Sequence, residues 1–127
     1  MDWTCNIYTG WLGMLLGCVA GAVVGIFFYK EDFLGGYTSW RRRMVRLGHI
    51  SFFGIGLINL LFGLSVKTLG MAEFPTLASV LLIVAMVAMP TVCYLSAIKG
   101  LFRHLFFVPA GSVMIAIALL LWKIYQS

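Results

Sequence analysis

Long runs of apolar residues alternate with short polar segments along the whole chain. Four runs contain no charged residue, if histidine is counted as neutral: 3–29, 47–66, 74–98 and 105–122. A helix needs about 20 apolar residues to cross a bilayer, and a segment in lipid must satisfy its own backbone hydrogen bonds. Residues 81–89 are apolar throughout, unlike the alternating strands of a barrel. We therefore predict an all-α membrane protein, a four-transmembrane-helix bundle.

The predicted helices cover about 8–29, 42–67, 75–98 and 101–124, in a single domain of residues 1–127. The fourth helix is expected to start before Pro109. The stretch from Pro109 to Ile124 is too short to cross the membrane comfortably, because each helical residue adds only about 1.5 Å.

Composition supports the membrane assignment, since 62% of the residues are hydrophobic and only 10% are charged. A soluble domain carries about 25% charged residues. The net charge of +5 is explained by basic residues at helix ends, so we expect no nucleic-acid partner. The expected partners are the lipid bilayer and either other membrane subunits or further copies of the chain in a homo-oligomer.

Basic residues gather at the helix ends on one side of the predicted membrane. Seven lie at the connection between the first and second helices or between the third and fourth: Lys30, Arg41, Arg42, Arg43, Arg46, Lys99 and Arg103. Only Lys67 and Lys123 lie at the opposite ends of the helices. Short loops rich in Lys and Arg remain in the cytoplasm. We therefore predict that the N and C termini are both on the non-cytoplasmic side of the cell inner (plasma) membrane.

Glycines repeat every four residues along the first helix, at Gly13, Gly17, Gly21 and Gly25. Such a glycine zipper forms a groove in which a second backbone can approach closely. We expect it to accept another helix of this chain, with a second copy or a different subunit as alternatives. Asn59 of the second helix is expected to point inward and bond another helix, because lipid would leave its amide unsatisfied.

The chain has two histidines, His49 and His104, each predicted at the cytoplasmic start of a helix. Each is followed seven residues later by a glycine, Gly56 and Gly111. Seven residues are about two turns, so each glycine lies on its histidine's own face. Two imidazoles on different helices are what a six-coordinate b-type haem requires.

Cationic side chains near the histidines would suit the haem propionates. These are Arg42, Arg46 and Arg103. The sequence therefore allows a metal site in which His49 and His104 are axial ligands of haem b, with a quinone or another headgroup at the same edge as an alternative. Histidines also occur at membrane interfaces without any ligand, so the alternative to a bound ligand is that both histidines are simply interfacial residues.

No nucleotide-binding, catalytic-triad or metal-binding motif is present, and all four acidic residues lie outside the predicted helices. An ion-coupled transporter usually buries such a residue. We expect a non-enzymatic small integral membrane protein, an accessory or scaffold subunit of a membrane complex such as a respiratory one. The first alternative is a mono-haem b-type electron carrier, with or without a link to quinone. The second is a passive channel or small-molecule exporter.

Overall fold

The computed structural model describes all 127 residues and is entirely helical. Its elements are α1 (Trp3–Phe27), η1 (Phe33–Gly35), α2 (Trp40–Leu69), α3 (Thr76–Ile98), η2 (Gly100–Phe106) and α4 (Phe107–Gln126), where η marks a 3₁₀-helix. Four helical stretches are long and apolar enough to cross a membrane, and η2 together with α4 forms the fourth. The predicted helical class and the number of spans are confirmed, and they fit a multi-pass membrane protein.

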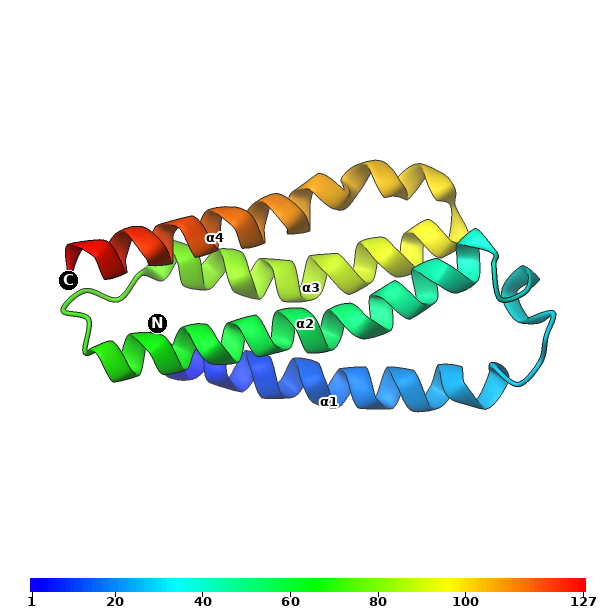
Figure 1. Cartoon of the computed structure of the whole chain (residues 1–127), viewed down its shortest axis with the longest axis horizontal. Helices are drawn as coiled ribbons and strands as arrows, with labels where there is room; N and C mark the ends of the chain where they lie inside the picture. Colours follow the sequence, from blue (N-terminus) through cyan, green and yellow to red (C-terminus); the bar gives the residue numbers. More distant parts are fainter.

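The four helices lie side by side in chain order, each antiparallel to the next (Figure 1). Each helix packs against its chain neighbours, and α1 also touches α3. The two termini and the α2–α3 loop lie at one end, and the α1–α2 loop and η2 lie at the other (Figure 1). Because α1 and α4 do not pack together, the bundle is open on one side.

Burial is concentrated in the two middle helices. In the most apolar stretches of α2 and α3, 39% and 44% of the residues are buried. In the edge helices α1 and α4 the share is 17%. The main core cluster lies near the termini and consists of Phe62, Val66, Ala78, Leu82 and Ala116. The outer faces of α1 and α4 are therefore left for lipid or for another protein.

Helix caps explain where α1 and α2 begin. α1 starts at Trp3 rather than near residue 8, because Asp2 Oδ1 accepts a hydrogen bond of 3.1 Å from the Thr4 backbone N–H. The Thr4 hydroxyl also lowers the pKa of the Asp2 carboxyl. Ser39 caps α2 in the same way, and Gly70 ends it with φ 56°. That left-handed conformation suits glycine, which has no β-carbon.

The fourth span begins as a 3₁₀-helix, η2, and becomes α-helical only at Phe107. Pro109 gives the reason, because proline has no N–H and its ring crowds the carbonyl four residues earlier. Starting at Phe107 places Pro109 in the first turn, where an N–H needs no partner in the helix. An α-helix from residue 101 would have placed it in the interior.

Candidate functional site

His49 lies on the face of α2 that packs against α1. A β-carbon added to Gly21 would come within 2.3 Å of His49 Cε1, so the imidazole fills the space over this glycine. The ring of Phe53 stands edge-on to it, with 5.3 Å between ring centroids. His49 Nδ1 is buried and has no hydrogen-bond partner. The imidazole therefore serves as packing between two helices in this arrangement.

His104 lies elsewhere, exposed on η2 beside α3 and α4. None of the five main cavities is lined by either histidine. The two glycines paired with the histidines also differ. The space beside Gly56 is taken by the carbonyl of Gly10, whereas Gly111 faces open space.

Two of the arginines expected beside a haem are already engaged. Arg42 is 5% exposed, and its Nη2 donates to the Phe28 carbonyl at 2.7 Å. Arg46 Nη2 donates to the Tyr37 carbonyl at 3.3 Å, and the guanidinium lies 4.4 Å from the centre of the Tyr37 ring. Both hold the α1–α2 loop. In this arrangement, neither Arg42 nor Arg46 is free to pair with a haem propionate.

The first turn of α2 binds carbonyls in the last turn of α3 and just past the end of α1. Arg42 Nη1 reaches two further carbonyls past the end of α1, at 3.4 and 3.5 Å. On the other side, Trp40 Nε1 donates to Ser96 O at 3.0 Å and Arg41 Nε donates to Ala97 O at 3.1 Å. A cation near a helix C-terminus also complements the helix dipole. Arg43 and Arg103 are exposed, and no hydrogen bond or ion pair engages their side chains.

The glycine stripe of α1 is filled from within the chain along most of its length. Side chains lie over its first three members, namely Met86 at Gly13, Phe53 at Gly17 and His49 at Gly21. A β-carbon at Gly25 would meet nothing within 4 Å.

The closest approach of backbones lies one step before this stripe. A β-carbon at Gly10 would lie 2.6 Å from Gly56 O, and one at Gly63 would lie 2.7 Å from Trp3 O. Gly10, Gly56 and Gly63 thus allow α1 and α2 to touch through their main chains.

A fully buried polar cluster joins the first three helices, and sequence analysis found only one of its members. Asn6 on α1, Asn59 on α2 and Ser79 on α3 each have 0% exposure. Asn6 Nδ2 donates to Asn59 Oδ1 at 2.9 Å, and the Ser79 hydroxyl donates to Asn6 Oδ1.

The remaining bonds of this cluster reach main-chain carbonyls. Asn59 Nδ2 donates to Ile55 O within α2 and to Leu82 O across to α3, each at 3.1 Å. Asn6 Nδ2 also reaches Ser79 O at 3.5 Å. Every amide hydrogen of the two asparagines is therefore hydrogen-bonded, and the cluster holds the three helices together.

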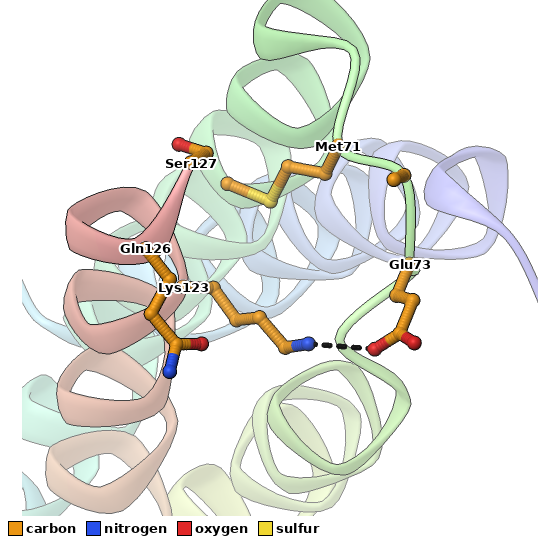
Figure 2. Close-up of a pocket in the computed structure, with 6 residues that line it drawn as sticks. Met71, Glu73, Lys123, Gln126 and Ser127 are labelled. Carbon is orange, nitrogen blue, oxygen red and sulfur yellow. Dashed lines mark hydrogen bonds and ion pairs between the residues drawn. The ribbon is translucent and has the colours of Figure 1, made fainter.

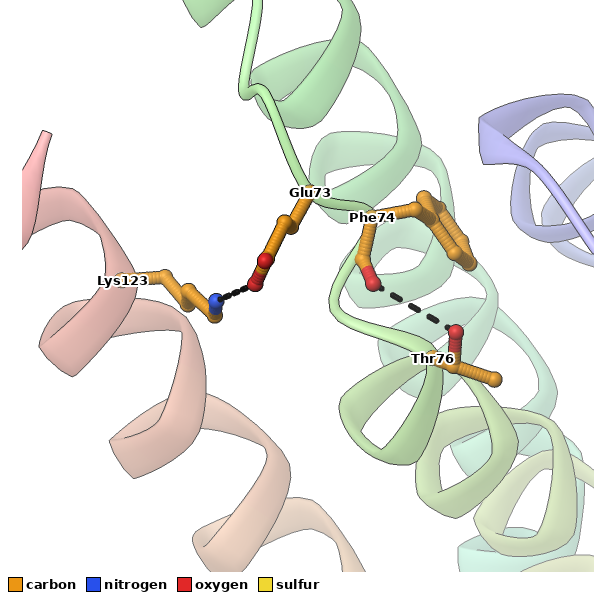
Figure 3. Close-up of polar contacts among 4 residues, drawn as sticks. All are labelled: Glu73, Phe74, Thr76 and Lys123. Atoms are coloured by element: carbon orange, nitrogen blue, oxygen red, sulfur yellow. Dashed lines mark hydrogen bonds and ion pairs between the residues drawn. The ribbon is translucent and has the colours of Figure 1, made fainter.

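The only ion pair of the chain lies at the end that holds the termini. Lys123 Nζ and Glu73 Oε2 are 2.9 Å apart across an open pocket of about 280 Å³ (Figure 2). Figure 3 shows the same pair beside Thr76, whose hydroxyl donates to Phe74 O at 3.4 Å. The hydrogen bond from Lys123 lowers the pKa of Glu73. The pair ties the end of α4 to the α2–α3 loop.

No known family model, characterised protein or solved structure matches the chain. The functional conclusions below therefore rest on the geometry of this molecule.

Proposed function

We propose that this chain is a non-enzymatic scaffold or accessory subunit of a larger membrane complex. The single observation that carries the proposal is the contrast between a fully hydrogen-bonded interior and the exposed apolar faces of the two edge helices. Asn6, Asn59 and Ser79 tie three helices together with no unsatisfied amide, while α1 and α4 turn most of their apolar side chains outward. A rigid frame with two large outer faces suits a protein that holds other membrane helices.

The proposed orientation places both termini on the non-cytoplasmic side of the inner membrane. Seven basic residues gather at the end with the α1–α2 loop and η2, against two at the end with the termini. A reporter active only in the cytoplasm should be silent when fused after Ser127 and active when inserted between Gly35 and Gly36. The reverse pattern would overturn this orientation.

The scaffold role is tested by the size of the native particle. The chain extracted from its own membrane in a mild detergent should migrate on a native gel as a discrete species larger than the purified chain. A cysteine replacing Leu15, on the exposed face of α1, should then cross-link to a neighbouring subunit in a variant without native cysteines. A cysteine replacing the buried Ala85 is the control. An extracted particle no larger than the purified chain would contradict the proposal.

The electron-carrier alternative has a direct spectroscopic test. The purified, dithionite-reduced chain should show no b-type α band, because His49 packs against α1 and His104 lies on η2, and two of the three arginines beside them are engaged. A band that His49→Ala and His104→Ala each abolish would replace the scaffold proposal with a haem held between chains.

A channel or exporter is the least supported alternative. The buried cluster lies between α1, α2 and α3, and every amide hydrogen of its two asparagines is already bonded. Flux of small solutes through liposomes containing the chain should equal that of empty liposomes.

A further inference from the structure

The largest of the five main cavities is a lateral cleft between α2 and the fourth span. It has a volume of about 420 Å³, within the range of small-molecule sites. Leu47, Ile50 and Gly54 of α2 form one wall, and Phe106 and Val113 form the other. We call this the α2–α4 cleft.

The α2–α4 cleft offers no free polar group to an occupant. Its one hydroxyl, Ser51 Oγ, donates to Gly48 O at 2.7 Å. The cleft is open because one wall lacks a side chain: a β-carbon at Gly54 would meet nothing within 4 Å. Its occupant must therefore be apolar along its length.

Two unengaged arginines stand one turn beyond the cleft on its two walls. Arg43 precedes Leu47 by four residues and Ile50 by seven, so all three share a face of α2. Arg103 precedes Phe106 by three residues within η2, and a 3₁₀-helix has three residues per turn. Arg103 therefore lies on the same face of η2 as Phe106.

The chemistry of this pair points to an anion. The other arginines of α2 donate hydrogen bonds to main-chain carbonyls; these are Arg41, Arg42 and Arg46. Arg43 and Arg103 remain available to an anion. Guanidinium groups bind phosphate with two parallel hydrogen bonds. A quinone head would need a hydrogen-bond donor inside the cleft and would leave both cations without a partner.

We propose that the α2–α4 cleft binds one anionic phospholipid. An acyl chain lies against Gly54 and Ile50, and the phosphate is held between Arg43 and Arg103 at the membrane surface. In the proposed orientation this is the cytoplasmic leaflet, whose anionic lipids attract basic residues. The inference does not depend on the scaffold function, and it holds whether or not another subunit binds.

Native mass spectrometry of the delipidated chain tests the proposal, with phosphatidylglycerol and phosphatidylcholine added separately. The wild-type chain should retain one phosphatidylglycerol with about thirtyfold preference, since two basic residues each contribute near a membrane surface. Arg43→Gln/Arg103→Gln should reduce the preference to near one. Lys30→Gln/Lys67→Gln removes the same charge elsewhere and should keep it.

A second variant separates the apolar part of the site from the charges. Gly54→Leu should project into the cleft, because a β-carbon there would meet nothing within 4 Å, and it should abolish retention of both lipids while helicity and melting temperature persist. Gly25→Leu, also in open space on α1, should retain lipid normally. Equal retention of the two lipids by the wild-type chain would overturn the proposal. So would unchanged binding in Gly54→Leu, or displacement of the lipid by inorganic phosphate alone.

Discussion

The two sides of α2 are built in opposite ways. Toward α1, the backbones touch at Gly10 and Gly56, and a polar cluster closes the interface. Toward α4, the same helix leaves a cleft of about 420 Å³ beside Gly54. Glycine therefore has two uses in one helix. At Gly56 the missing side chain brings two helices together, and at Gly54 it keeps space open.

The difference shows that a glycine in a membrane helix cannot be interpreted from its spacing alone. Association in lipid depends on close packing and on polar contacts, since there is no hydrophobic drive between helices. The α1–α2 interface has both, and the α2–α4 side has neither. The same type of substitution on the two sides should therefore give very different results.

The largest effect is expected from Gly10→Leu. Its β-carbon would collide with the carbonyl of Gly56, which is main chain and cannot move aside. The helices must separate, so the free energy of unfolding should fall by more than about 3 kcal/mol, above the usual cost of overpacking. Thermal unfolding in detergent measures this. Gly54→Leu and Gly25→Leu should stay near wild-type stability. An equal loss of stability in all three variants would contradict the proposed difference between the two sides of α2.

Asn59→Leu should have the second largest effect. It removes three hydrogen bonds and leaves the Asn6 amide without its partner in α2. Hydrogen bonds in membrane proteins average about 0.6 kcal/mol each, so we expect a loss of about 2 kcal/mol. The matched control is Thr91→Val, which removes a bond within α3 only. A melting temperature equal to that of the control would mean that the cluster does not lock the helices.

Gly21→Ala should cost less, about 1 kcal/mol, because the atom it meets belongs to a side chain. The added methyl would push the His49 ring aside rather than separate two backbones. Hydrogen exchange should increase on α1 near this position and remain unchanged near Asn6. Gly25→Ala serves as the control in open space. A loss as large as that of Gly10→Leu would show that His49 is more rigidly held than its contacts suggest.

The smallest effect is expected at the ion pair. Because Lys123 lowers the pKa of Glu73, the pair stabilises the fold above the carboxyl's ordinary value of 4.5. That contribution is lost as the pH falls through the lowered pKa. Both groups reach solvent, so the melting temperature of Glu73→Gln should be only slightly below wild type at pH 7. The difference should vanish in acid and in about 1 M salt, where the screening length is about 3 Å.

The number of helices could be predicted from the sequence because it follows from the lengths of the apolar runs. Some contacts could also have been found there. Asn6 continues the spacing of Gly10, Gly13 and Gly17, so it lies on the same face of α1. Extending the glycine stripe by two steps would have placed Asn6 opposite α2.

The relative position of the histidines could not be predicted, because equal depth in a membrane does not fix the direction around each helix. His49 turns toward α1, whereas His104 lies in a 3₁₀ segment on the side of α3 and α4. That 3₁₀ segment depends on Pro109 as well as on the length of the apolar run. The predicted haem pair requires two histidines that face each other, whereas the structure places His49 over Gly21 of α1 and His104 on η2.

The two-sided capping by the first turn of α2 has a consequence for how the protein is made. The carbonyls of Phe28 and Lys30, just past the end of α1, accept hydrogen bonds from Arg42, a residue that is synthesised only after the loop it holds. We therefore expect α1 to enter the membrane as half of a hairpin, and the loop after it to stay open until α2 has followed. A released chain that ends at residue 39 should leave this loop open to protease, and one that ends at residue 69 should protect it.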